Sequence, residues 1–576
     1  MLAFFSLEGA KQELKVTETI ESCLTERSEQ LQGLEGRASQ LLWEKETQTR
    51  WAKVDHLLYL PVLGLTRPRD LYYYQGQGLR VLYGFSYKYL TVEQFLGRLS
   101  RLEVGHPLAA ALAQSYSQGW YPGDEPLVIY VDWHIKPHWT KYPAHSGAVT
   151  MWGRVMPGTK QLIINGPEGH VLGGWNRAID SHLSGVLVEL EAQLSTYLQR
   201  PIAYTVCDSE GGGLPLGEQY IAANQAYLSY LCRQGYPLDD FELLTEWQAV
   251  NDDPEREVVQ ARWLDPAKAE AEVRDLVLMR RVGDSDPSRI YTGKLPASLT
   301  VSEVPGAYRQ RWSCQERVIR EAVNGANLNA NFGYSYQQVA NRTRQRQWDQ
   351  AQEQVEVSER SIARHSQALR NLQRQLVSLR QAYQQQQLAF QHDLQAWQSD
   401  FLARQLNGQP LRRCQQRLAR TFRHQDKFSS RYQRRRQKIL VQLRQHRRKL
   451  SQTWLQLSHR QEIRDALDTD SLCRERNLEK DQIMLNLQLL LTNLHHWVRT
   501  HYFAAPWQQL ELKTATALIY RKSGWVDWGA DTIEVLLAPY RYPEHQHAME
   551  ESCRRFNAAN LRWRDGRLLR IRVAPP

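Results

Sequence analysis

LVIYVDWHIKP, residues 127–137, is the stretch from which the fold of the chain can be inferred. Its first five residues are aliphatic, β-branched or aromatic, which predicts a buried strand. Asp132 follows them, and an unpaired carboxylate is costly in such surroundings. It requires a cation, a metal ion or a dense hydrogen-bond shell. We therefore expect the strand to end at Asp132 and to present this carboxylate to a site of chemistry.

A second stretch has the same form. IAYTVCDSEGGG, residues 202–213, runs from a strand-like segment into Asp208 and then into glycines. Between the two stretches, the pattern predicts two strands joined by a Gly-Pro-Glu-Gly turn at 166–169, and then a helix over 178–199. This order matches an RNase H-like core, in which the first and fourth strands are neighbours. Adjacent strands would bring Asp132 and Asp208 together.

Glu316 is the third acidic residue of the expected set. It lies in the helical-period segment AYRQRWSCQERVIREAV, residues 307–323, after a break at Pro305 and Gly306. Close carboxylates repel each other unless cations neutralise them, and Mg²⁺ binds such groups with few protein ligands. Two Mg²⁺ ions, or Mn²⁺ in their place, would activate a water or a 3′-hydroxyl for attack at phosphorus. The rival third acids are Glu242, Glu246, Glu255 and Glu257.

The composition indicates a multi-domain, basic chain. Its 576 residues are too many for one core, and 42% of them are hydrophobic. The 73 Lys and Arg exceed the 62 Asp and Glu, and the net charge of +11 favours a polyanionic partner. Seven scattered cysteines without a CxxC pair suit reduced thiols, and no apolar run is long enough to span a membrane. We expect a cytoplasmic protein without a membrane partner.

The N-terminal part of the chain has helical periodicity. It covers residues 7 to about 50 and residues 56–118, the latter including the apolar GLRVLYGF at 78–85. For residues 7 to about 50, a packing or oligomerising helix is favoured over a DNA-reading one. For residues 56–118, a helix-turn-helix stays open, so the region 1–118 is a possible DNA-end-binding region. Residues 236–304 instead alternate apolar and polar side chains, which predicts a β-rich insertion between Asp208 and Glu316.

The C-terminal part predicts a core helix and a small module. Residues 478–503 are strongly apolar and helical in pattern. TATALIY at 514–520, TIEVLLA at 532–538 and RLLRIRV at 567–573 are typical of strands, and a helix is expected near 544–558. We expect a small α/β module that serves packing, oligomerisation or DNA-end binding.

Residues 351–460 predict a coiled-coil hairpin, because apolar residues recur at heptad-like intervals on both sides of NGQP at 407–410. From Arg404 to Arg460 there are seventeen Lys or Arg and one acid, Asp426. Such an arm would repel itself unless a polyanion lay against it, so we expect salt-sensitive DNA binding. The residues expected to contact DNA, here and near Glu316, are Arg311, Arg317, Arg320, Arg342, Arg412, Arg413, Arg434, Arg435, Arg436, Lys438, Arg447 and Arg448.

The blocks together resemble the DDE transposases of bacterial insertion sequences, and more closely a group of large transposase-like proteins that share YVDGH-, DREG- and RW-x-QEN-like motifs. Here these blocks are YVDWH at 130–134, CDSEG at 207–211 and RWSCQER at 311–317. The similarity continues through NFGYSYQQVANRTRQRQW at 331–348 and LEKDQIMLNLQLLLTNLHHWV at 478–498. It implies an RNase H-like catalytic core, Mg²⁺ dependence and cut-and-paste movement of DNA.

The resemblance also assigns the site. Asp132, Asp208 and Glu316 take the three catalytic and metal-binding positions. Related transposases carry a Tyr, an Arg and a later Lys around the glutamate. Tyr308 and Arg311 fit, but the spacing to Glu316 is one residue long, and Val323 stands near the Lys position. Arg317 or Arg320 would have to supply that charge.

The expected architecture is α/β, and its parts follow the chain. They are a helical N-terminal region (1–118), an RNase H-like core (119–235 and 305–350) with a β-rich insertion (236–304), a long basic helical hairpin (351–460), a core-packing helix (461–510) and a small α/β C-terminal module (511–576).

The expected protein is a bacterial, nucleoid-associated DNA transposase. It would act as a homodimer on double-stranded DNA, cleaving transposon ends and joining them to target DNA. Three alternatives stay open: an inactive or domesticated DNA-binding relative, a coiled-coil scaffold whose strand-end acids only cap turns, and a nuclease without strand transfer.

Overall fold

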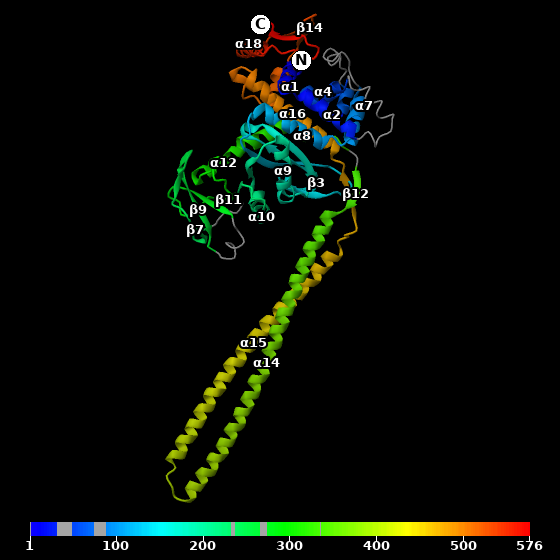
Figure 1. The fold of residues 1–576 in the computed structure, drawn as a ribbon. Helices are drawn as coiled ribbons and strands as arrows, with labels where there is room; N and C mark the ends of the chain where they lie inside the picture. The colour runs from blue at the N-terminus through cyan, green and yellow to red at the C-terminus, as the bar shows by residue number, and fades with distance from the viewer. Residues whose placement is uncertain (1, 31–48, 74–87, 232–236, 265–273, 334–335) are drawn as a thin grey trace. The chain divides into compact units, whose positions relative to one another are not determined.

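The computed structural model describes residues 2–30, 49–73, 88–231, 237–264, 274–333 and 336–576, and it contains a large mixed sheet (Figure 1). The chain divides into two units. The core unit comprises Met1–Gln338 and Arg474–Pro576, and the hairpin unit comprises Val339–Cys473. The expected α/β class is confirmed by the mixed sheet and the helices around it.

In the described part of the chain, the sheet has eleven strands in the order β2-β3-β1-β5-β6-β11-β10-β9-β7, with β4 beside β3 and β8 beside β9. The first six strands are β1 (Leu127–Pro137), β2 (Ser146–Val149), β3 (Arg154–Asn165), β4 (Val171–Ala178), β5 (Ile202–Cys207) and β6 (Tyr227–Tyr230). The predicted turn at 166–169 joins β3 to β4. Strand β1 pairs antiparallel with β3 and parallel with β5, which confirms that the first and fourth predicted strands are neighbours.

The register of these strands places two acids at one point of the sheet. Parallel pairing of β1 with β5 extends to Val131 opposite Cys207, so Asp132 and Asp208 both follow the last paired residues. The expectation that the strand ends at Asp132 is wrong. Strand β1 continues to Pro137 because β3 keeps pairing with it, Asp132 standing opposite Ile163.

Three helices cover the half of the sheet that contains β1: α8 (Gly105–Trp120), α9 (Leu187–Leu198) and α16 (Glu479–His501). The predicted helix over 178–199 is shorter than expected, because residues 183–185 form a 3₁₀ turn and α9 begins at Leu187. Helix α16 packs on β4 and α8 and is buried on nearly all sides, as expected for a core helix. Among the described residues, no helix is both long and apolar enough to cross a membrane.

The β-rich insertion is present, but it does not form a separate sheet. Its strands are β7 (Phe241–Leu243), β8 (Gln248–Val250), β9 (Asp253–Trp263), β10 (Asp275–Arg281) and β11 (Arg289–Lys294). Strand β11 pairs with β6 of the core, Tyr291 standing opposite Tyr230. The insertion therefore extends the sheet that carries Asp132 and Asp208.

The N-terminal region is helical, as expected, but the predicted long helix is broken. Helices α1 (Leu2–Glu13) and α2 (Val16–Gln30) are separated near Lys15, whose φ of 51° is left-handed and incompatible with a continuous helix. Residues 31–48, the second half of that prediction, and GLRVLYGF at 78–85 lie outside the described residues. The helices that follow are α4 (Arg50–Leu58), α5 (Leu60–Leu63) and α7 (Tyr89–Arg101).

In the C-terminal module, one predicted strand is wrong. TATALIY belongs to α17 (Leu512–Ala515) and to a π-helical turn, η10 (Thr516–Tyr520). Its β-branched and aromatic residues favour a strand, yet the buried positions have helical spacing. Those buried positions are Leu512, Ala515, Thr516, Ile519 and Tyr520. The remaining elements are β14 (Gly524–Trp528), β15 (Thr532–Leu537), α18 (Pro543–Ala558) and β16 (Leu568–Val573).

The hairpin unit is an antiparallel pair of long helices, as expected, and its arms are longer than predicted. Helix α14 spans Arg342–Leu406 and α15 spans Arg412–Asp465, with NGQP in the turn between them. Rings pack across the seam, for example Tyr383 on Tyr432 with centroids 4.0 Å apart. Strands β12 (Tyr336–Ala340) and β13 (Leu472–Arg476) pair where the chain enters and leaves this unit. The six described cysteines are buried and form no disulfide with one another, and Cys232 lies outside the described residues.

Buried ion pairs join distant parts of the core unit. Lys136 of β1 is 1% exposed, and its Nζ lies 2.8 Å from Oδ1 of Asp481 on α16. Asp481 also accepts a bond from Arg476 at 3.1 Å. Burial alone would raise the pKa of Asp481, but Lys136 and Arg476 hold that pKa below its ordinary value. A second network, Glu8, Lys11, Asp55 and Arg564, links α1 and α4 to the C-terminal module, near which both chain ends lie (Figure 1).

Lys136→Met is expected to lower the free energy of unfolding by about 3 kcal/mol, because it leaves the Asp481 carboxylate buried without its closest cation. The measurement is urea denaturation. The matched control is Arg281→Ala, which removes an exposed pair with Glu255 and should cost less than about 1 kcal/mol. Equal losses for the two variants would contradict a buried, stabilising link between β1 and α16.

Candidate active site

One guanidinium joins two of the three predicted acids. Nη1 of Arg311 lies 2.8 Å from Oδ2 of Asp132, and its Nη2 donates to Oε1 of Glu316. The side chains of Arg311, Asp132 and Glu316 are 11%, 20% and 30% exposed. Asp132 on β1 and Glu316 on the glutamate helix therefore meet at one cation in a partly buried place.

A π-helical turn brings Glu316 to this position. The helix begins with α12 (Val304–Arg311), continues as η8 (Trp312–Glu316) and ends as α13 (Arg317–Gly325). The N–H of Arg317 donates to the carbonyl of Trp312, five residues earlier, which is the π-helical pattern. Arg311 and Glu316, also five residues apart, consequently share a face. The π turn thus accommodates the extra residue in the Arg-to-Glu spacing. The helix also begins at Val304, so Pro305 and Gly306 are in its first turn and do not break the chain before it.

Two hydrogen bonds, one buried and one partly buried, hold this helix against the sheet. Gln315 is fully buried, and its Nε2 donates to the carbonyl of Ile163 on β3 at 3.2 Å. On the other side of the turn, the hydroxyl of Tyr130 on β1 donates to Oε1 of Gln310 at 2.8 Å. Since Ile163 is the strand partner of Asp132, the helix is anchored at the level of the acid it faces.

Asp208 is held by a different set of contacts. It follows β5 and caps the short turn η5 (Ser209–Gly212), its Oδ1 accepting the N–H of Glu210 at 2.9 Å. This is the turn-capping role considered as an alternative from the sequence. The capping bond uses one carboxylate oxygen, so it does not prevent Asp208 from also serving the site.

The pKa values of both aspartates are raised. Burial raises the pKa of Asp132 to about 6, with the Arg311 cation opposing the rise and the Asp208 charge adding to it. Burial also raises the pKa of Asp208, opposed by the Glu210 N–H and by the charges of Arg311 and Lys160. Both carboxyl groups thus bind a proton more readily than in water. A raised pKa is expected of neighbouring carboxyl groups that are only partly neutralised by a cation.

Sequence reasoning missed Lys160 as part of the site. It lies on β3, where its Nζ donates to the carbonyl of Ser181 at 2.7 Å and stands 5.1 Å from the centroid of the Trp133 ring. Its charge lowers the pKa of Asp208. No motif surrounds Lys160 in the sequence, so only the pairing of β3 with β1 reveals it.

The predicted replacements for the missing helix lysine face elsewhere. Arg317 donates to Gln509 and Arg320 to Glu511, each at 3.3 Å. On the insertion, Arg280 pairs with Glu257 and Arg281 with Glu255. These two arginines are therefore paired with carboxylates of the neighbouring strand β9.

The donor set of the site suits Mg²⁺, since three carboxylates are hard oxygen ligands. One oxygen each of Asp132 and Glu316 bonds Arg311, and the other oxygen of Asp132 accepts the N–H of Trp133 at 2.7 Å. The Arg311 guanidinium thus compensates the negative charges of Asp132 and Glu316, as a metal ion would. In the part of the chain that the structure describes, no three or more His, Cys, Asp or Glu side chains are already gathered as a metal site. Binding of Mg²⁺ would require Arg311 to release both acids.

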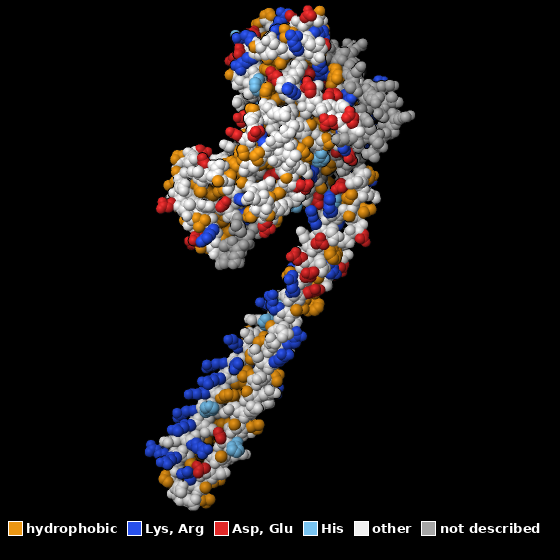
Figure 2. All heavy atoms as spheres, in the orientation of Figure 1, with side chains coloured by type: hydrophobic (Ala, Val, Ile, Leu, Met, Phe, Trp, Pro, Cys, Tyr) orange, Lys and Arg blue, Asp and Glu red, His pale blue; other side chains and the backbone are white. Residues whose placement is uncertain are grey.

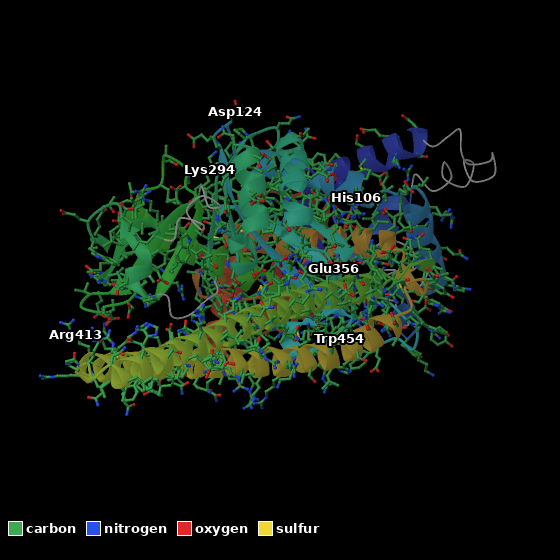
Figure 3. The ribbon with its side chains drawn as sticks, turned by 90° about the horizontal axis from the view of Figure 1, so that it is seen from below. His106, Asp124, Lys294, Glu356, Arg413 and Trp454 are labelled. Atoms are coloured by element: carbon green, nitrogen blue, oxygen red, sulfur yellow. The ribbon has the colours of Figure 1, made fainter. Side chains whose placement is uncertain are left out.

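The basic residues of the hairpin unit lie on its surface. Figure 2 shows Lys and Arg side chains gathered along one arm of the hairpin, and Figure 3 places Arg413 at its tip, with Glu356 and Trp454 toward the other end. Arg342 begins α14. The remaining predicted contacts are exposed on α15: Arg412, Arg413, Arg434, Arg435, Arg436, Lys438, Arg447 and Arg448.

A scan against protein-family models finds no match to this chain, and a search of curated proteins finds none either. The resemblance to DDE transposases therefore stays an expectation drawn from the sequence blocks.

Asp132→Asn is expected to stabilise the protein at pH 7 by about 2 kcal/mol, after allowance for the partial exposure of the group. The folded-state pKa of about 6 lies above the value near 4 of an unfolded aspartate, so the folded protein binds the proton more readily. The contribution of this group to stability is present below pH 4 and is lost as the pH rises through 6. The Asp132→Asn variant has no carboxyl group at this position, so its stability does not fall in this way as the pH rises.

The measurement is urea denaturation of both proteins between pH 4 and 8, with the exposed Asp124→Asn as the control variant. The stability gain should shrink as the pH falls to 4. A variant no more stable than the wild type at pH 7 would show that Asp132 is not held at a raised pKa.

Proposed function

We propose that this chain is a DNA transposase with an RNase H-like catalytic core. The observation that carries the proposal is the contact of one guanidinium, Arg311, with both Asp132 and Glu316, where Asp132 is on a strand whose parallel neighbour runs into Asp208. Asp132 and Asp208 follow the last paired residues of neighbouring parallel strands, and Glu316 reaches Asp132 through the shared Arg311. The antiparallel β3–β1 pair beside the parallel β1–β5 pair supports the assignment of the core.

Each residue has a role in the proposed reaction. Asp132, Asp208 and Glu316 would hold Mg²⁺, which supplies Lewis acidity for attack on phosphorus and for departure of the leaving oxygen. Arg311 keeps Asp132 and Glu316 in place before DNA binds, and its charge keeps the pKa of Asp132 from rising further. A guanidinium also binds phosphate through two parallel hydrogen bonds, so Arg311 can transfer from the acids to the DNA backbone.

The hairpin unit supplies affinity in this proposal. Helix α15 has 54 residues and therefore extends about 80 Å. Its exposed arginines would neutralise backbone phosphates, which strengthens binding without reading sequence. Two copies of the chain, one at each transposon end, would cleave the ends and join them to target DNA.

One observation favours a second candidate, a DNA-binding relative that performs no chemistry. Arg311 already neutralises Asp132 and Glu316, as a cation that has replaced the metal would do. This candidate predicts that Asp132→Ala leaves DNA affinity and any biological effect unchanged. Loss of the biological effect in that variant would exclude it.

Asp208→Asn is expected to reduce cleavage by about 10³-fold or more, because it removes a negative ligand for the metal. The assay uses the DNA that flanks the chain's own gene, with Mg²⁺, and scores both cleavage and joining of the 3′-hydroxyl end. The control is Asp124→Asn, an exposed acid that should retain activity. Cleavage that survives in Asp208→Asn would end the proposal, and cleavage without joining would identify a nuclease.

Replacing Arg434, Arg435 and Arg436 together by Gln is expected to weaken duplex binding and to flatten its salt dependence. The slope of log K against log salt should fall by about 0.9 for every phosphate that the variant no longer neutralises. The matched control replaces Arg256, Arg262 and Arg281 by Gln, because these are exposed and each is paired with a carboxylate. Fluorescence anisotropy with a labelled duplex at several salt concentrations measures the affinity and its salt dependence for each variant. Identical slopes for the two triple variants would show that α15 does not bind DNA.

A further inference from the structure

A cavity of about 340 Å³ lies at the far end of the strand that carries Asp132. Its lining begins at His138, immediately after β1, and includes Gly158 and Thr159 of β3, which pair with the last residues of β1. The main-chain N–H of His138 donates to the carbonyl of Pro157 at 2.8 Å, so this end of the strand pair is fixed. At about 3.3 Å per residue, the cavity lies some 20 Å from Asp132.

Exposed aromatic rings surround this cavity. Trp139 is 79% exposed, Tyr142 is 52% exposed and Tyr336 is 48% exposed. Trp139 stacks on Trp152 with ring centroids 5.6 Å apart and stays largely exposed, so a planar group can reach its ring. Large aromatic surfaces in contact with water are unfavourable, and grouped ones indicate a binding site.

A cation is held between two of these rings. The guanidinium carbon of Arg474 lies 3.3 Å from the centroid of Tyr142 and 4.0 Å from that of Tyr336. The N–H of Arg474 donates to the carbonyl of Pro143 at 2.8 Å, which fixes the backbone below the stack. The two tyrosines and the arginine therefore form a rigid wall, with the exposed Lys141 beside it in the chain.

Polar groups line the deeper part of the cavity. His145 is 5% exposed, and its Nε2 lies 3.9 Å from Oε1 of Glu475. Arg476 donates to Oδ1 of Asn331 at 2.9 Å. The cavity therefore combines aromatic faces, hydrogen-bonding groups at depth and cations at the rim.

We propose that this cavity binds one unstacked nucleobase of a DNA strand, an inference that rests on the proposed function because it needs DNA as the substrate. Bases stack on aromatic side chains and on arginine planes, and their edges seek hydrogen bonds. Trp139 provides the stacking face, His145 and Glu475 face the base edge, and Arg474 with Lys141 attracts the phosphates. The 340 Å³ volume lies at the lower end of the range for small-ligand pockets, which suits a single base.

The test compares two single-stranded oligonucleotides, one of thymidines and one with abasic sites in the middle, by fluorescence anisotropy in the presence of EDTA. The wild-type protein should bind the thymidine strand about 5- to 150-fold more tightly than the abasic strand. Trp139→Ala should lose most of this preference, and Trp139→Phe should keep part of it. The control is Trp525→Ala on β14, a ring that is 64% exposed, which should keep all of it.

Two results would overturn the inference. One is an equal affinity of the wild-type protein for both strands. The other is displacement of the thymidine strand by thymidine monophosphate at similar concentration, which would assign the cavity to a free nucleotide. The same binding measurements on Asp208→Asn protein should give the wild-type preference. Failure of the cleavage assay and failure of base binding are therefore separate outcomes.

Discussion

Charge compensation between Arg311 and the carboxylates of Asp132 and Glu316 is the constraint on which the geometry of the candidate site depends. Carboxylates from separate elements can share a partly buried place only if a cation lies among them. The parallel β1–β5 pair brings Asp132 beside Asp208, the π turn directs Glu316 inward, and Gln315 fastens that turn to β3. These features keep a costly group of charges in one arrangement, as an active site requires.

The sequence predicted the parts of the fold that rest on local pattern. The runs before Asp132 and Asp208 have strand composition, the apolar run at 478–503 has helical composition, and the heptads of the hairpin are long and regular. Each prediction was confirmed because a single buried face determines such an element. The strand predicted for TATALIY is wrong because the helical spacing of its buried residues outweighs the β propensity of its side chains.

Other features depend on contacts between residues far apart in sequence. The π turn is stabilised by Gln315 bonding to Ile163, about 150 positions away, so periodicity alone could not reveal it. The same holds for Lys160 near Asp208, and for the β6–β11 pairing that joins the insertion to the core sheet. For the candidate site, the strand and helix patterns predict the three acids, whereas the bond of Arg311 to two of them depends on the fold.

The Lys136–Asp481 pair has a consequence for biosynthesis, because its partners are 345 positions apart with the whole hairpin unit between them. A ribosome that adds 5–20 residues per second emits Asp481 about 20–70 s after Lys136. During that delay, β4 lacks the helix that covers it, and its apolar face is available to chaperones or to other nascent chains. Because the hairpin is antiparallel, the local contacts that it forms while it emerges bring β12 and β13 together, and α16 then follows directly after these two paired strands.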